Sequence, residues 1–247
     1  VNTPEWFMEK RRQAEELVRN LTDVIDTKTA NEVFDGYCRQ TYLDNLLRGG
    51  TPVFFGKDDR KMPFYMYSRK HGDPEREYNA FSLGDEYYAQ GNGNFRDVCQ
   101  NRRCDVFFHP QLKDFGIRTF FELIQSDGYN PLVMTFSTFR MQPKDAKDCS
   151  MKLPKKDREN AVTLLTEEFT PGRLAMFAQD CGLEEEENRE FMDLCLGKAQ
   201  CDPNADFGEG YWSDHWTYLQ DLIDQYLELY PEEKKSLLFA EENLRWY

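Results

Sequence analysis

Residues 29–50 read TANEVFDGYCRQTYLDNLLRGG, and their pattern sets the fold class of this chain. Apolar side chains recur there every three or four residues, which is the spacing of one face of an α-helix. They are Val33, Phe34, Tyr37, Cys38, Tyr42, Leu43, Leu46 and Leu47. Gly49 and Gly50 follow, and glycine is the usual residue just beyond a helix C-terminus. We therefore expect a helix from Thr29 to Arg48.

The segments on either side of this helix repeat its pattern. Residues 4–26 have apolar residues at helical spacing, with Pro4 suited to the first turn behind Thr3. The same spacing returns at residues 95–108, 117–124, 161–169, 171–181, 183–196 and 212–229. Thr170 is placed to cap the helix 171–181, and Pro231 to begin a final one. We predict a single, mainly α domain over residues 1–247, built from successive helical hairpins.

Three segments depart from this pattern. Glycine and proline interrupt residues 51–95, which we interpret as a loop-rich insertion with short extended pieces such as residues 62–68. Residues 131–140, PLVMTFSTFR, fit a short strand as well as a buried helix, because short apolar runs do not separate the two. The lysine-rich residues 143–156 are expected to form an exposed connection.

The net charge of the chain limits the classes of partner that it is expected to bind. It has 31 basic and 45 acidic residues, a formal net charge of -14, which opposes binding to nucleic acid and to anionic membranes. We find no run of the roughly 18 to 20 apolar residues that a membrane-spanning helix needs, and no signal-peptide pattern. Seven irregularly spaced cysteines indicate reduced thiols. We expect a soluble, cytoplasmic protein without a metal site.

A first polar cluster, SRKHGDPEREY, occupies residues 68–78. Charges of both signs surround a turn there. One interpretation is a surface network of salt bridges, each of which adds little stability. The other is a binding loop on a rigid frame, in which Arg69, His71 and Asp73 are candidates for substrate binding.

A second cluster, QGNGNFRDVCQNRR, occupies residues 90–103. Its glycines allow the backbone to approach a ligand, and its Arg, Asp, Asn and Gln side chains suit sugar hydroxyls, which both donate and accept hydrogen bonds. A dinucleotide-binding loop is disfavoured, because the last glycine of that fingerprint is missing. The structural alternative is a capped helix in which Arg96 and Asp97 form an ion pair.

A third cluster, GEGYWSDHWTY, occupies residues 208–218. Aromatic side chains stack on sugar rings, and Trp212 and Trp216 would remove the Asp214 carboxyl from water, which favours its protonated form. A protonated carboxyl is what a general acid needs near neutral pH. The structural alternative makes Asp214 the N-cap of the helix that ends at Leu229, with the aromatic residues in the core.

The second and third clusters together resemble the catalytic domain of the inverting glycoside phosphorylases of glycoside hydrolase family 94, such as the cellobiose and 1,2-β-oligoglucan phosphorylases. In that family a segment like Gly-Phe-Arg-Asp-x-x-Gln lines the sugar subsite, and residues 95–100, FRDVCQ, are similar to it. A later Gly-Asp-Trp-Asn-Asp segment ends on the general acid, and residues 210–214, GYWSD, are similar to that. Residues 42–50 and 67–73 resemble the large, divergent members.

The resemblance implies an (α/α)6 barrel and a reaction in which phosphate displaces one sugar from another with inversion. By this resemblance Asp214 is the proton donor. The implied substrate-binding residues are Arg96, Asp97, Gln100, Tyr211, Trp212 and His215, together with Arg69, His71 and Asp73. The implied partners are an oligosaccharide or glucan substrate and inorganic phosphate as co-substrate, without a cofactor.

The extent of the resemblance and the reaction class leave alternatives open. The phosphate-binding residues of the family lie beyond the acid, so we expect the chain to form about the first half of the barrel. The rest of a longer chain, or another subunit, would complete it. An inverting hydrolase would pair the same acid with a carboxylate base, Asp97 or Asp73, roughly 6.5 to 9.5 Å away. A third hypothesis is that the chain is a noncatalytic sugar-binding or assembly subunit.

Overall fold

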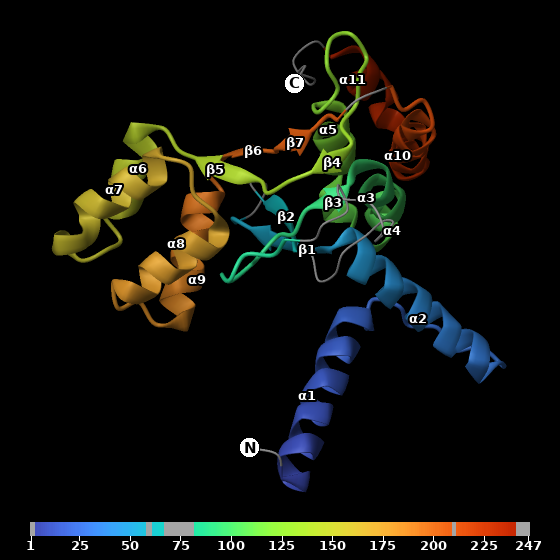
Figure 1. Ribbon diagram of the computed structural model, residues 1–247, viewed down its shortest axis with the longest axis horizontal. Coiled ribbons are helices and arrows are strands. Elements are labelled where there is room, and N and C mark those ends of the chain that lie inside the picture. The colour runs from blue at the N-terminus through green and yellow to red at the C-terminus, as the bar shows by residue number, and fades with distance from the viewer. Residues whose placement is uncertain (1–2, 58–60, 67–81, 209–210, 241–247) are drawn as a thin grey trace.

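The computed structural model describes residues 3–57, 61–66, 82–208 and 211–240, and it is mainly helical (Figure 1). The helices are α1 (Pro4–Thr22), α2 (Glu32–Gly49), α3 (Phe95–Arg102), α4 (Asp105–Phe108), α5 (Phe115–Phe121), α6 (Pro143–Ser150), α7 (Arg158–Thr166), α8 (Pro171–Asp180), α9 (Glu185–Leu196), α10 (His215–Leu229) and α11 (Lys234–Phe239). Short 3-10 turns are η3 (Pro110–Leu112), η4 (Lys155–Asp157) and η5 (Pro231–Glu233). The mainly α prediction is confirmed.

Three small antiparallel sheets connect the helices. Strands β1 (Thr51–Phe55) and β2 (Met62–Met66) form a hairpin. Strand β4 (Val133–Met134) lies between β3 (Gly93–Asn94) and β7 (Ala205–Asp206), and β5 (Thr138–Arg140) pairs with β6 (Gln200–Asp202). The ambiguous residues 131–140 therefore contain two strands, because both of their short apolar runs find partner strands from distant parts of the chain.

The predicted helix ends are largely confirmed. The Thr3 hydroxyl accepts a hydrogen bond from the Trp6 amide at 3.2 Å, and Thr170 accepts one from the Arg173 amide at the same distance. Helix α2 begins later than expected, because the Asn31 side chain caps it. It ends before Gly50, whose φ of +90° is one that glycine adopts without strain.

The apolar side chains form two cores. The first packs the β1–β2 hairpin, β5 and the helices α6 to α9 around Phe139, Phe169 and Leu196. The second packs α3, α5, β4 and α10 around Phe95, Phe120 and Leu219. In Figure 1 the α6–α9 helices lie on one side of the molecule, and α3, α5 and α10 lie on the other, with the strands between them.

Helices α1 and α2 begin the chain as expected, but α1 extends away from both cores (Figure 1). Within the part of the chain that the structure describes, Thr22 is the one buried residue of α1. The apolar side chains Trp6, Phe7 and Leu17 are exposed. The pattern correctly predicted an amphipathic helix, whereas the packing of its apolar face does not follow from the pattern.

The expectation for residues 143–156 was wrong. Instead of an exposed connection, the chain forms α6, and Ala146 and Cys149 on one face of it are buried in the first core. Leu153, just beyond the helix, is buried as well. The lysines occupy the other face, so their abundance concealed a short amphipathic helix.

Candidate functional site

The three-stranded sheet brings the second and third polar clusters together. Strand β4 pairs with β3 through Met134 and Gly93, and with β7 through Val133 and Asp206. Strand β3 continues directly into α3, which carries Arg96 and Asp97, and β7 comes shortly before the segment that carries Asp214. The middle strand therefore places two segments more than a hundred residues apart at one site.

The polar groups of this site are joined by Arg96. Its Nη1 lies 3.6 Å from Oδ2 of Asp214, and its Nε donates to Oδ1 of Asp97 at 3.1 Å. Burial works against the charged guanidinium, but the two carboxylates outweigh that effect and raise the pKa of Arg96. The Asp214 side chain is 57% exposed, so a bound molecule can reach it.

A second ion pair fixes the register of the helices at the site. Helices α3 and α10 are in contact, and Arg103, the C-cap residue of α3, pairs with Asp221 on α10. Arg103 follows Arg96 by seven residues, and Asp221 follows Asp214 by the same number. Two turns of each helix thus separate the two pairs, so the helices run parallel and their N-terminal ends meet at Arg96 and Asp214.

The structure separates the two readings of Asp214. Asp214 occupies the N-cap position of α10, but among the described residues its side chain makes no capping hydrogen bond to the helix. Its carboxylate lies beside Arg96 instead. The capping interpretation therefore correctly locates the start of the helix, although the carboxylate has no capping role.

His215 packs beneath the surface that carries Arg96 and Asp214. The side chain, 3% exposed, stacks between the rings of Phe95 and Trp212, with centroids 5.5 and 6.0 Å away. Burial lowers the pKa of His215 to about 4, against the opposing charges of Asp214 and Asp97. The imidazole is therefore neutral near pH 7 and packs beneath the surface, whereas we expected it to contact substrate.

The aromatic residues divide between surface and core. Trp212 is half-buried on the face of His215, and Tyr211 is exposed with its ring 5.7 Å from that of Tyr129. Trp216 was expected to shield Asp214, but it packs against the second core. The two tryptophans therefore do not enclose the carboxylate. Trp216 projects from α10 two residues after Asp214, a different direction around the helix.

The second cluster contains both an ion pair and a packing constraint. Gln100 is exposed on α3, one turn after Arg96 and on the same face. A Cβ atom at Gly93 would lie 2.7 Å from Cγ2 of Val98, so any larger residue there would force the packing around Val98 to shift. The Arg96–Asp97 pair of the structural alternative is present, but Arg96 also reaches Asp214. The candidates Arg69, His71 and Asp73 lie outside the described residues.

Sequence reasoning missed the residues that hold the site in place. Asn130 donates from Nδ2 to the carbonyl oxygen of Trp212 at 3.2 Å. The equal spacing of the Arg96–Asp214 and Arg103–Asp221 pairs was a usable signal, since it is visible once the two helices are predicted. For Asn130, the sequence Gly-Tyr-Asn-Pro at residues 128–131 predicts a turn, but it does not indicate that Asn130 binds the Trp212 backbone.

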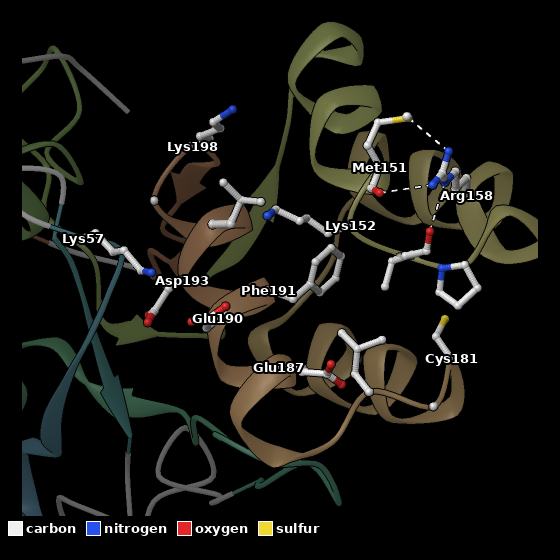
Figure 2. A pocket seen from close by; sticks show the side chains of 16 residues that line it. Lys57, Met151, Lys152, Arg158, Cys181, Glu187, Glu190, Phe191, Asp193 and Lys198 are labelled. Atoms are coloured by element: carbon white, nitrogen blue, oxygen red, sulfur yellow. Dashed lines mark hydrogen bonds between the residues drawn. The ribbon is translucent and has the colours of Figure 1, made fainter.

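A separate cavity of about 1010 Å³ lies between the α6–α7 and α8–α9 hairpins (Figure 2). Lys57 and Asp193 lie at one side of it, Arg158 and Cys181 lie at the other, and Phe191 lies between them. None of the candidate residues around Asp214 lines this cavity. The candidate site is therefore an exposed surface on the other half of the molecule.

The described part of the chain has neither a metal-binding cluster nor a membrane-spanning helix. Over residues 3–57, 61–66, 82–208 and 211–240, His, Cys, Asp and Glu side chains form no group of three or more that would hold a metal ion. No helix in those ranges is long and apolar enough to cross a bilayer. No family model, curated protein or solved structure matches the chain.

Proposed function

We propose that this chain carries the general acid and part of the sugar-binding surface of an inverting glycoside phosphorylase that cleaves β-glucosidic bonds. The observation that supports the proposal best is the Arg96–Asp214 contact, with Asp97 on the other side of the guanidinium. It joins the two segments whose sequences resemble the sugar subsite and the acid motif of that family. An (α/α)6 barrel completed by further chain, or by another subunit, belongs to the same proposal.

In the proposed reaction Asp214 donates its proton to the glycosidic oxygen as the bond to the anomeric carbon breaks. A phosphate oxygen attacks the same carbon from the opposite face, so the products are a sugar 1-phosphate of inverted configuration and the released sugar. Asp214 ends as the carboxylate, and Arg96 is positioned to stabilise that negative charge. Arg96, Asp97 and Gln100 present donors and acceptors for sugar hydroxyls.

The test compares Asp214→Asn with Asp224→Asn in the whole protein. Asp224 lies on α10 as well, is exposed, and accepts a hydrogen bond from Gln220, which makes it a matched control. Release of sugar 1-phosphate from β-linked glucans and phosphate is followed by phosphorus NMR. We expect Asp214→Asn to lower kcat by about 10²- to 10⁴-fold and Asp224→Asn to match the unaltered protein.

A second substrate isolates the role as acid. A nitrophenyl glycoside has a leaving group that departs without protonation, so the loss caused by Asp214→Asn should nearly vanish on it. Equal losses on both substrates would show that Asp214 acts in binding and not as an acid. An unchanged rate on the glucan would support the noncatalytic reading.

The hydrolytic alternative is favoured by one observation, the second carboxylate, Asp97, beside Arg96. A hydrolase pairs its acid with a carboxylate that activates water. The two reactions differ in their need for phosphate. Cleavage that proceeds without phosphate, and that does not run backwards from sugar 1-phosphate and an acceptor sugar, would replace the phosphorylase with a hydrolase.

A further inference from the structure

We propose that Asn130 is a positioning residue that holds the segment carrying Asp214, and this inference rests on the function proposed above. The Asn130 side chain is fully buried, with 0% exposure, and its Nδ2 donates to the carbonyl oxygen of Trp212 at 3.2 Å. Trp212 precedes the acid by two residues. The amide therefore anchors the backbone immediately before the candidate catalytic side chain.

The Trp212 carbonyl is the point where this anchor acts on the helix. The backbone N–H of His215, the first residue of α10, donates to the same oxygen at 3.3 Å. The carbonyl oxygen of Trp212 thus accepts one hydrogen bond from Asn130, in the turn at residues 128–131, and one from the start of α10. Asp214 lies between Trp212 and His215 in the chain, so both hydrogen bonds constrain the position of its Cα.

The turn that carries Asn130 is itself well fixed. The Gln125 amide donates to the Tyr129 carbonyl at 2.9 Å, and the Gly128 amide donates to the Gln125 carbonyl at 2.8 Å. Gly128 has a φ of +87°, which glycine adopts without strain. Asp127 accepts from the Tyr129 amide at 3.1 Å. The rings of Tyr129 and Tyr211 provide a second contact between this turn and the acid segment.

The same stretch of chain also holds the other half of the site. Just after Asn130, the Leu132 amide donates to the Asp206 carbonyl at 2.9 Å, and the Leu132 carbonyl accepts from the Phe95 amide at 3.0 Å. Phe95 is the first residue of α3, next to Arg96. Residues 125–132 therefore connect the segment that carries Asp214 to α3, and the Asn130 side chain supplies a hydrogen bond to that segment.

The activity test uses Asn130→Leu, which keeps the approximate shape but removes the donor. The Trp212 carbonyl keeps its bond to His215, so the change loosens the acid segment without leaving that oxygen unpaired. We expect kcat on a glucan to fall by about 10²-fold, the loss that a displacement of about 1 Å causes, with KM changed by less than about twofold because the sugar-subsite side chains remain. The loss should be much smaller on a nitrophenyl glycoside.

Asn204→Leu is the matched control. The Asn204 side chain donates from Nδ2 to the Phe136 carbonyl at 2.9 Å, so the same kind of side-chain hydrogen bond is removed from a backbone carbonyl other than that of Trp212. We expect its kcat to equal that of the unaltered protein. Asn130→Ala serves as the second variant if Asn130→Leu does not fold. Equal kcat values for the Asn130 and Asn204 variants would overturn the proposal.

A structural readout separates this proposal from the proposed function. Hydrogen exchange of the His215 amide reports the first turn of α10, and we expect it to be about tenfold faster in Asn130→Leu than in Asn204→Leu, as loss of one supporting hydrogen bond predicts. Faster exchange in a protein that never releases sugar 1-phosphate would reject the function and keep the anchor. Unchanged exchange would reject the anchor whatever the activity.

Discussion

We expect Asp105 to make the stability of this protein depend on pH. The residue, 7% exposed, begins α4 and accepts a hydrogen bond from the Tyr65 hydroxyl at 2.8 Å. The guanidinium of Arg102 lies 3.7 Å above the Tyr65 ring. Burial raises the pKa of Asp105 to about 7, although the Tyr65 hydrogen bond and the charge of Arg102 act in the opposite direction. Removal of the carboxylate from water is thus the stronger effect.

The size and sign of the effect follow from this pKa. An unfolded aspartate has a pKa of about 3.9, so between about pH 4 and pH 7 the folded chain binds more protons than the unfolded one. Its free energy of unfolding therefore falls as pH rises through this window. A difference of about 3 pKa units corresponds to about 4 kcal/mol, of which roughly two thirds is lost between pH 5 and pH 8.

The assay is urea unfolding of the protein and of Asp105→Asn at about pH 5 and about pH 8. The asparagine keeps an oxygen that accepts from Tyr65, so the variant isolates the charge. We expect the unaltered protein to lose about 2 to 3 kcal/mol relative to the variant over this range. A difference between the two proteins that does not change with pH would refute the argument, because it would mean that Asp105 of the folded chain is already ionised at pH 5.

Two further predictions concern the candidate site. The neutral, buried imidazole of His215, with its pKa lowered to about 4, should make the protein lose up to about 3 kcal/mol of stability as pH falls from about 6.5 to about 4, since the unfolded chain binds the extra proton. His215→Gln should remove that slope in acid-unfolding curves, and an unchanged slope would contradict the assignment. Gly93→Ala should lower the free energy of unfolding by about 1 to 3 kcal/mol, because the new methyl group would lie 2.7 Å from Val98 Cγ2. Thermal unfolding beside Gly36→Ala, where nothing lies within 4 Å of the added atom, provides the control, and equal melting temperatures would count against the clash.

The helices could be predicted because each is set by nearby residues. Thr3, Thr170 and Gly50 mark helix ends through contacts within one or two turns, and the apolar spacing is visible in the sequence. The same local reasoning failed for residues 143–156, where the apolar face of α6 consists of small residues such as Ala146. A weak stripe beside several lysines does not stand out until the core that buries it is known.

The candidate site was predicted residue by residue, whereas its geometry was not. Motif spacing pointed to Arg96, Asp97 and Asp214, but it misplaced Trp216 and His215, which belong to the second core and its edge. The type of a residue determines which chemistry its side chain can perform. Whether an indole faces a carboxylate or packs inward depends on the direction it takes around α10, and on which neighbours cover that face.

Local pattern alone was therefore enough to predict a mainly α chain and most of its helix ends, and it singled out Arg96, Asp97 and Asp214 as candidate residues. The adjacency of Arg96 and Asp214 was decided by tertiary structure. It requires β4 to pair with β3 on one side and β7 on the other, and Arg103 to pair with Asp221. The pairing of strands only two residues long is set by contacts between distant parts of the chain, and such contacts leave no periodic signal in the sequence.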